Sequence, residues 1–126
     1  LGDVYKRQLQ GVRNGLITLQ KSFRQKPGLV ADGRDMGTMI FPDATVKIYL
    51  IASAQIRAER RYNQLNEKGI NASLTEIEEA IRARDQRDEQ REIAPMKAAA
   101  DAEVIDTTQL EIVEVVTRVK ALLLCP

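Results

Sequence analysis

Val46-Lys47-Ile48-Tyr49-Leu50-Ile51-Ala52-Ser53 is the stretch that decides the fold. Residues 46–51 are rich in β-branched and apolar side chains, which favour a buried strand. Ser53 can cap a following helix, because its side-chain oxygen can accept a hydrogen bond from a backbone N–H of the first turn. We expect that helix to run to about Lys68 and to stop at Gly69. A strand that leads directly into a capped helix is typical of α/β proteins.

Hydrophobic periodicity and capping residues predict the other elements on either side of this unit. We expect helices at 9–26, 73–91 and from 108 to the C-terminus, and short strands at 29–31 and 103–106. Ser73-Leu74-Thr75-Glu76 and Thr108-Gln109-Leu110-Glu111 are capping boxes, in which the first and last side chains accept from each other's backbone N–H. The order helix–strand–strand–helix–helix–strand–helix predicts an α/β fold with a parallel sheet flanked by helices.

The composition excludes several classes of protein. The 126 residues include no His, which removes His general bases and His-ligated metal sites. Cys125 is the only cysteine, so neither an internal disulfide nor a CxxC metal site can form. The net charge of +1 and the lack of a long apolar run argue against a nucleic-acid coat and a membrane span. We therefore expect a cytoplasmic protein, with no nucleic-acid or membrane partner, that relies on Arg and Asp for its chemistry.

The most distinctive segment is Arg84-Asp85-Gln86-Arg87-Asp88-Glu89-Gln90-Arg91. On a helix with 100° per residue, four of its side chains share an arc of about 100°: Arg84, Arg87, Asp88 and Arg91. Like charges at this spacing repel one another, and an anionic ligand would reverse that effect because guanidinium groups bind phosphate bidentately. Asp88 could accept hydrogen bonds from sugar hydroxyl groups. The alternative interpretation is an ordinary solvated helix face.

A second candidate segment, Asp32-Gly33-Arg34-Asp35, lies in a predicted loop at the C-terminal end of a predicted strand. In open α/β sheets, ligands bind in the crevice beyond such strand ends. The Arg and Asp side chains there could hold a phosphate and the polar edge of a base. The alternative is a turn that uses Asp and Gly for their backbone tolerance.

The predicted helix after Ser53 carries a basic edge, because Arg57, Arg60 and Arg61 stand at positions i, i+3 and i+4. Such a helix could close over the phosphates of a nucleotide, or it could be an exposed charged helix. The seven glycines form neither a GxxxxGK[ST] nor a GxGxxG motif. The sequence therefore lacks the usual phosphate-cradling loop.

Two blocks of sequence together resemble a known family. The first is Gly28-Leu29-Val30-Ala31-Asp32-Gly33-Arg34-Asp35-Met36-Gly37-Thr38 with Phe41-Pro42-Asp43-Ala44, and the second is Arg84-Asp85-x-Arg87-Asp88-x-x-Arg91 followed by Ala94-Pro95 and Ala99-Ala100-Asp101-Ala102. Over about Val12 to Leu123 the chain resembles the bacterial cytidylate kinases. The resemblance implies a P-loop kinase fold and transfer of a phosphoryl group from ATP to CMP or dCMP with Mg²⁺. It also implies a monomeric enzyme in the intact family.

The resemblance further implies roles for individual residues. Six would form the CMP site in pairs: Arg13 and Asp35 for the cytosine base edge, Arg34 and Arg91 for the acceptor phosphate, and Arg84 and Asp88 for the sugar hydroxyl groups. A lid at about residues 53–72, with Arg57, Arg60 and Arg61, would close over ATP, and residues 106–108 would lie against the adenine. The catalytic residues would be Arg34, Arg91 and Arg60, which neutralise charge on the reacting groups.

The family begins with a strand, a GxxxxGKGT loop, its helix and a CMP-binding insert, and none of these has a counterpart here. We therefore expect residues 9–126 to be the C-terminal part of a nucleoside monophosphate kinase domain, truncated at the N-terminus. Residues 1–8 are expected to be a leader foreign to the fold. The ligands of Mg²⁺ would lie in the missing N-terminal half, and the fragment would be inactive alone.

Other hypotheses stay open beside the kinase. A non-catalytic arginine-rich module could bind RNA or a protein partner, although the chain has few aromatic side chains to stack on bases. A purely structural α/β piece is a third reading, but it leaves the two matched blocks unexplained. Within the kinase class, the nearest alternative is a nucleoside monophosphate kinase with a different base preference.

Overall fold

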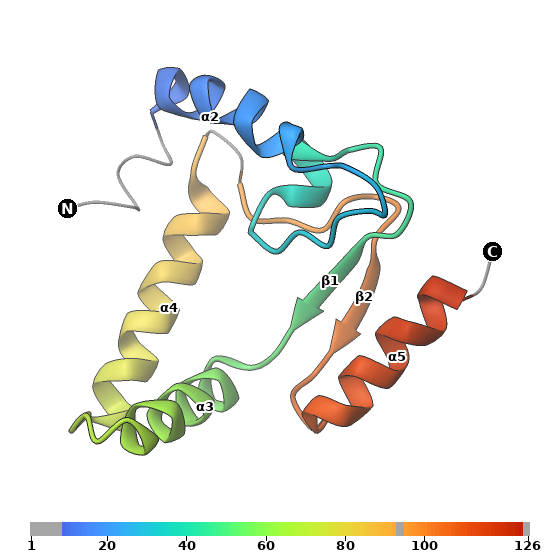
Figure 1. The fold of residues 1–126 in the computed structure, drawn as a ribbon. Helices are drawn as coiled ribbons and strands as arrows, with labels where there is room; N and C mark the ends of the chain where they lie inside the picture. Colours follow the sequence, from blue (N-terminus) through green and yellow to red (C-terminus); the bar gives the residue numbers. More distant parts are fainter. Residues whose placement is uncertain (1–8, 93–94, 125–126) are drawn as a thin grey trace.

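The structure is a computed structural model, and it describes residues 9–92 and 95–124. Within this part of the chain the elements are α2 (Gln10–Ser22), η1 (Met36–Ile40), β1 (Ile48–Ile51), α3 (Ala54–Glu67), α4 (Leu74–Gln90), β2 (Glu103–Asp106) and α5 (Ile112–Leu124). Figure 1 shows α5 beside β2, and α2 at the opposite end of the molecule from α3. The predicted leader, residues 1–8, lies outside the described residues.

The two strands run parallel, which confirms the predicted α/β class. Ile48 is paired with Glu103 and Ile51 with Asp106, so β1 and β2 match over their whole lengths. The backbone N–H of Thr107 donates to Ile51 O at 2.7 Å and extends the pairing past the last strand residue. Parallel strands need a long crossover connection, and the α3–α4 arm, residues 54–90, supplies it.

The strand predicted at residues 29–31 is wrong. The sheet of the described residues contains only β1 and β2, and Val30 is 94 % exposed. Apolar composition favours a strand only where a neighbouring strand can satisfy its backbone N–H and C=O groups. No described strand lies beside residues 29–31, so they stay irregular.

The predicted helix caps around the α3–α4 arm are confirmed. Ser53 Oγ accepts from the backbone N–H of Ile56 at 3.2 Å, and Ser73 Oγ accepts from that of Glu76 at 3.4 Å. Helix α3 stops just before Gly69, whose φ of +70° is a conformation that glycine adopts most easily. Local capping chemistry therefore fixes both ends of α3 and the start of α4.

The final helix begins later than predicted. It starts at Ile112 instead of next to Thr108. The backbone N–H of Glu111 donates to Glu114 Oε2 at 2.8 Å, so the carboxylate half of a capping box forms one turn further on. The Thr108 hydroxyl donates instead to Asp106 Oδ1 at 2.6 Å, which binds it to the end of β2.

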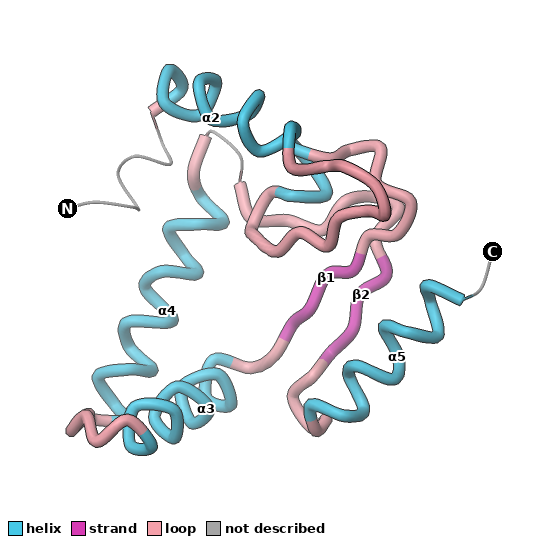
Figure 2. The backbone as a smooth tube through the Cα atoms, viewed as in Figure 1, coloured by secondary structure: helices cyan, strands magenta, loops and turns pink. Residues whose placement is uncertain are grey.

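The segment between α2 and β1 is mostly irregular, as the tube in Figure 2 shows. Helix α2 ends at Ser22, short of the predicted residue 26. The predicted loop at 32–38 tightens into the single π-helical turn of η1, where the backbone N–H of Ile40 donates to Asp35 O at 3.2 Å. Ile40 and Phe41 are both buried, so this turn is anchored in the core, whereas no residue of the loop at 24–35 is buried.

The apolar core of the described residues is small. Its buried members are Ile40, Phe41, Ala58 and Ile105. Ala58, on α3, is completely buried. Many large apolar side chains remain exposed, on α2, η1, α4 and α5 and on both strands. These faces do not belong to membrane spans, because no described helix is long and apolar enough to cross a bilayer.

Candidate functional site

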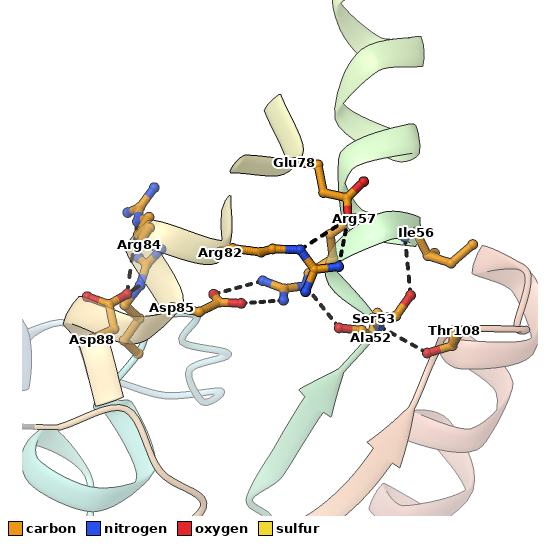
Figure 3. Close-up of polar contacts among 11 residues, drawn as sticks. Ala52, Ser53, Ile56, Arg57, Glu78, Arg82, Arg84, Asp85, Asp88 and Thr108 are labelled. Carbon is orange, nitrogen blue, oxygen red and sulfur yellow. Dashed lines mark hydrogen bonds and ion pairs between the residues drawn. The ribbon is translucent and has the colours of Figure 1, made fainter. Parts of the chain in front are cut away.

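Asp88, near the C-terminal end of α4, lies at the centre of an arginine cluster. Its carboxylate accepts a hydrogen bond from Arg34 Nε at 2.6 Å. Arg91 Nη2 lies 3.3 Å from Asp88 Oδ1, and Arg84 Nε lies 4.0 Å from Oδ2. Figure 3 shows Arg84 and Asp88 next to each other on α4. Three guanidinium groups around one carboxylate leave the cluster with a formal charge of +2, so it favours an anionic ligand.

Arg91 contributes the most deeply buried guanidinium of this cluster. Its side chain is 5 % exposed, and its Nη2 is buried without a hydrogen-bond acceptor. The residue follows directly after α4, with an extended backbone, and its Nε donates to Asp88 O at 3.3 Å. A buried donor that lacks an acceptor is costly, and an oxygen of an anionic ligand would satisfy it.

The helical arc predicted for four side chains is only partly realised. Arg84 and Asp88 share it on α4, and Arg91 reaches the same carboxylate from just beyond the helix end. Arg87 is exposed, and its Nε donates to the carbonyl of Ala83 at 3.3 Å. Arg87 therefore stands apart from the Asp88 cluster, because its side chain folds back along its own helix.

A hollow of about 300 Å³ lies next to the cluster, between α2 and the loop that precedes η1. Four predicted site residues line it: Arg13 from α2, Arg34 and Asp35 from the loop, and Arg91. Arg13 Nη2 forms an ion pair with Asp35 Oδ2, and both side chains are largely buried. Apolar side chains of α2 and η1 form most of the remaining wall, together with Gln20, Asp32 and Gly33. The volume is at the lower end of the range for small-ligand sites, about 300–1,000 Å³.

Arg57, predicted for the lid, is held by the chain's own backbone and by α4. Its Nη1 and Nη2 donate to the two carboxylate oxygens of Asp85 at 2.9 and 2.5 Å, and its Nε donates to Ala52 O at 3.0 Å (Figure 3). These hydrogen bonds with Asp85 raise the pKa of the Arg57 guanidinium. Arg57 therefore ties the turn between β1 and α3 to the middle of α4.

Arg60 and Arg61, the other predicted lid arginines, have different surroundings. Arg60 Nη2 donates to Thr107 O at 2.5 Å, and its Nη1 donates to Thr107 Oγ1 at 3.1 Å. Thr107 is buried and follows β2, within the segment 106–108 that the resemblance places against adenine. Arg61 is exposed on α3. The arginine edge of α3 is therefore partly occupied by contacts with the end of the sheet.

The sequence analysis missed two residues that hold these arginines, Asp85 and Thr107. Asp85 belongs to the arginine-rich block, but helical periodicity turns it away from the arc of Arg84 and Asp88. Its partner Arg57 comes from another helix, so the spacing along one helix carries no signal for the pair. Thr107 offers a backbone carbonyl to Arg60, and the sequence gives no indication of such a contact.

A metal site built from protein ligands is not found in the described part of the chain. No group of three or more His, Cys, Asp or Glu side chains there could hold a metal ion. Magnesium that accompanies a nucleotide is commonly bound by only one or two carboxylates together with phosphate oxygens. These residues do not build a cage for Mg²⁺, and no residue of this chain is assigned to it.

The fold and the cluster together define an α/β protein with an arginine-lined hollow. The sequence profile of the family described as Cytidylate kinase matches residues 5–123, and the chain belongs to the cytidylate kinase family. This confirms the resemblance drawn from the two sequence blocks.

Curated relatives from several bacteria carry the same family name. The chain is 58 % identical to the cytidylate kinase of Methylococcus capsulatus over 105 residues, which are 83 % of this chain and 47 % of the relative. It is 53 % identical to that of Pseudomonas entomophila over 113 residues, 90 % of this chain and 50 % of the relative. It is 54 % identical to that of Nitrosomonas europaea over 112 residues, 89 % and 50 %. The chain thus spans about half the length of these relatives.

Proposed function

We propose that this chain carries the acceptor-nucleotide side of a cytidylate kinase, which transfers the γ-phosphoryl group of ATP to CMP or dCMP. The observation that carries the proposal is the cluster in which Asp88 gathers Arg34 and Arg91 at the edge of a hollow. Membership of the cytidylate kinase family supports it. A cytoplasmic location and a monomeric intact enzyme stay predictions.

The hollow suits a pyrimidine nucleoside monophosphate. In the proposed complex, Arg34 and Arg91 bind the acceptor phosphate, which adds the negative charge that the cluster lacks. The Arg13–Asp35 pair offers the base a donor and an acceptor side by side, and the carboxylate can accept from the exocyclic amino group of cytosine. The sugar hydroxyl groups are assigned to Arg84 and Asp88.

The proposed reaction needs charge neutralisation and alignment more than a nucleophilic side chain. An oxygen of the acceptor phosphate forms a bond to the γ-phosphorus of ATP, and the bond from that phosphorus to the bridging oxygen breaks as ADP leaves. Arg34 and Arg91 hold the attacking phosphate in line and reduce its repulsion by the incoming phosphoryl group. Mg²⁺ accompanies ATP and supplies charge stabilisation when bound.

The lid assigned to about residues 53–72 is proposed to close over ATP with Arg57, Arg60 and Arg61. In the structure, Arg57 is bound to Asp85 and Arg60 to Thr107. A guanidinium has five N–H donors, so each of these two arginines can contact a phosphate oxygen of ATP with donors that its protein acceptor does not use, or by exchanging that acceptor. Arg60, proposed as catalytic with Arg34 and Arg91, lies next to the segment 106–108 assigned to the adenine.

Titration calorimetry with CMP tests the acceptor site directly on this chain. Arg91→Ala should cost about 2–4 kcal/mol of CMP binding, as loss of one buried charged contact usually does. Arg87→Ala is the matched control, because that arginine is exposed on the same helix and its Nε donates to Ala83 O. CMP should also bind more tightly than UMP or AMP, because the Asp35 carboxylate accepts from the amino group of cytosine.

Two results would contradict the proposal. If Arg91→Ala binds CMP as tightly as the unmodified chain, the cluster does not hold the acceptor phosphate. If UMP or AMP binds more tightly than CMP, the base assignment to Arg13 and Asp35 is wrong. Salt-dependent binding of RNA with no response to CMP would favour the arginine-rich binding module instead. With ATP and CMP together, the chain alone is expected to form no CDP, since its sequence has no phosphate-cradling loop.

A further inference from the structure

Two aspartates of α4 stand three positions apart and bind arginines from different parts of the molecule. Asp88 accepts from Nε of Arg34, which lines the hollow, at 2.6 Å. Asp85 accepts from Nη1 and Nη2 of Arg57, on α3, at 2.9 and 2.5 Å. Three positions of an α-helix span about 4.5 Å along its axis, because each residue adds about 1.5 Å. The same turn of α4 therefore carries both the arginine cluster and the contact with Arg57.

Arg57 joins this turn of α4 to the end of the sheet. It lies in the first turn of α3, and its Nε donates to the carbonyl of Ala52, directly after β1, at 3.0 Å (Figure 3). Strand β1 also faces this part of α4. Burial, followed by the nearby carboxylates of Glu89 and Asp85, raises the pKa of the Tyr49 hydroxyl on β1. A single guanidinium therefore bridges the backbone at the end of β1 and a carboxylate of α4.

Little apolar packing holds the C-terminal turns of α4 in place. Among the described helices and strands, α3 is the one that packs extensively against α4. The one buried residue of α4 is Asp88, which is polar. The position of this end of the helix thus depends on polar contacts, and a bidentate pair such as that of Arg57 with Asp85 constrains orientation as well as distance.

The arginine cluster depends on where this turn lies. Arg34 comes from the loop at 24–35, in which no residue is buried, so apolar packing does not fix its position. Its Nε is held by the hydrogen bond to Asp88 at 2.6 Å. A displacement of Asp88 by about 1 Å away from Arg34 would break this bond, because such bonds do not extend to about 3.6 Å. The same displacement would move Arg91, which follows α4, relative to Arg34.

We propose that the Arg57–Asp85 pair positions the arginine cluster, because it fixes the turn of α4 that presents Asp88 to Arg34. Neither Arg57 nor Asp85 lines the hollow, so both are positioning residues and not ligands of CMP. The inference rests on the proposed function, since it names what sets the geometry of the acceptor site. It adds a role to Arg57 beside the lid, because three hydrogen bonds leave two of its five N–H donors for a phosphate.

Charge alone predicts a different result from positioning. Removal of the Asp85 carboxylate makes the surroundings of the cluster more positive, so by charge alone CMP would bind more tightly. Removal of the Arg57 guanidinium would have the opposite effect. Positioning predicts that both substitutions weaken CMP binding, because each releases the same turn of α4. The sign of the change in Asp85→Ala therefore separates the two explanations.

Titration calorimetry of the full chain with CMP measures that sign. Arg57→Ala and Asp85→Ala should each weaken CMP binding by about tenfold, and the double variant should lose no more than either single variant. Arg82→Ala is the matched control, because Arg82 also pairs with a carboxylate of α4, Glu78, but that pair lies within one helix. It should bind CMP as the unmodified chain does. Circular dichroism shows that each variant is folded at the temperature of the titration.

The Nε–H proton of Arg34, followed by NMR without CMP, gives a measurement that does not depend on the proposed function. It should exchange with water several-fold faster in Arg57→Ala and in Asp85→Ala, and Arg82→Ala should leave it unchanged. An unchanged rate in the first two variants, tighter CMP binding in Asp85→Ala, or losses that add in the double variant would each overturn the positioning role. If the unmodified chain does not bind CMP while the Arg34 proton responds as expected, the proposed function fails and the positioning role stands.

Discussion

The arginine cluster and the two-stranded sheet differ in how far their side chains are buried. Asp88 and Arg91 are almost fully buried, and their partner Arg34 comes from a segment far away in the sequence. The sheet would be expected to lie in the apolar core, yet its side chains Leu50 and Val104 are about half exposed. The polar site is therefore more complete within this chain than the apolar core that should support it.

The reason for the difference is physical. An ion-pair cluster is satisfied by a few groups at contact distance, so two segments suffice to build it: the loop with Arg34, and the C-terminal part of α4 together with Arg91. A hydrophobic core gains stability in proportion to the apolar area removed from water, and that area grows with the amount of polypeptide wrapped around it. A chain that spans about half the length of its relatives can thus contain a buried arginine cluster beside a sheet whose apolar side chains are exposed.

The largest effect should come from breaking the cluster. Asp88→Ala leaves the buried guanidinium of Arg91 without its counter-charge, which typically costs about 3–5 kcal/mol of unfolding free energy. Urea unfolding followed by circular dichroism measures the loss. Glu78→Ala is the control: Glu78 also pairs with an arginine, Arg82, but that arginine side chain is 64 % exposed, so its loss of a partner should cost less than about 1 kcal/mol. Equal costs for the two variants would show that the cluster is not a buried unit.

An intermediate effect is expected where the α3–α4 arm joins the sheet. A double-mutant cycle of Arg57→Ala and Asp85→Ala should give a coupling free energy of about 1 kcal/mol, because the pair is bidentate and only partly exposed. The same cycle on Arg82 and Glu78, an exposed pair within α4, should give about 0.3–0.5 kcal/mol. A coupling for Arg57 and Asp85 no larger than that of the control pair would mean that the arm is not fixed by this contact.

The elements that the sequence predicts well are those determined by neighbouring residues. Ser53 and Ser73 start their helices and Gly69 follows the end of one, because caps act over three or four positions. Residues 103–106 form a strand where expected, because a partner strand is present. Residues 29–31 do not, because strand formation depends on a neighbour that local composition cannot reveal.

The candidate site shows the same division between local and distant information. Helical periodicity correctly placed Arg84 beside Asp88, but it could not anticipate that Arg87 would bond to its own helix. The convergence of Arg34 with Asp88 was reached through the family resemblance, since 54 residues separate them. Contacts such as that of Arg57 with Asp85 join different helices, and a single sequence has no signal for them.

A small effect is expected in the sheet, where a substitution in the middle of a strand would ordinarily be severe. Leu50→Ser should change the unfolding free energy of this chain by less than about 0.5 kcal/mol, because the leucine is more than half exposed. Ala58→Leu is the contrast: that site is completely buried, and overpacking there should cost about 1–3 kcal/mol. Urea unfolding compares the two variants, and a cost for Leu50→Ser as large as that for Ala58→Leu would show that the sheet faces are already covered.

The smallest effect concerns an ion pair outside the cluster, between Arg24 at the end of α2 and Asp43. Two hydrogen bonds from Arg24, at 2.8 and 2.9 Å, lower the pKa of the Asp43 carboxyl to about 2, and the guanidinium also lies 4.7 Å from the centre of the Phe41 ring. An aspartate in an unfolded chain titrates near pH 4, about 3.9. Because the folded pKa is the lower one, the pair stabilises the fold fully above that pH, and its contribution disappears as the pH falls toward 2.

Carboxyl carbon chemical shifts, followed by NMR during an acid titration, measure this pKa. Arg24→Ala should return the Asp43 midpoint to near 4. The pKa of Asp101 is also lowered, in that case by a hydrogen bond from Lys47, and it should not respond to the substitution at Arg24. An Asp43 midpoint that stays low in Arg24→Ala would show that the backbone around Asp43 holds the carboxylate, and that the end of α2 is not tied down by this pair. Since α2 also carries Arg13, the result decides whether both ends of that helix are fixed by ion pairs or only the end at the hollow.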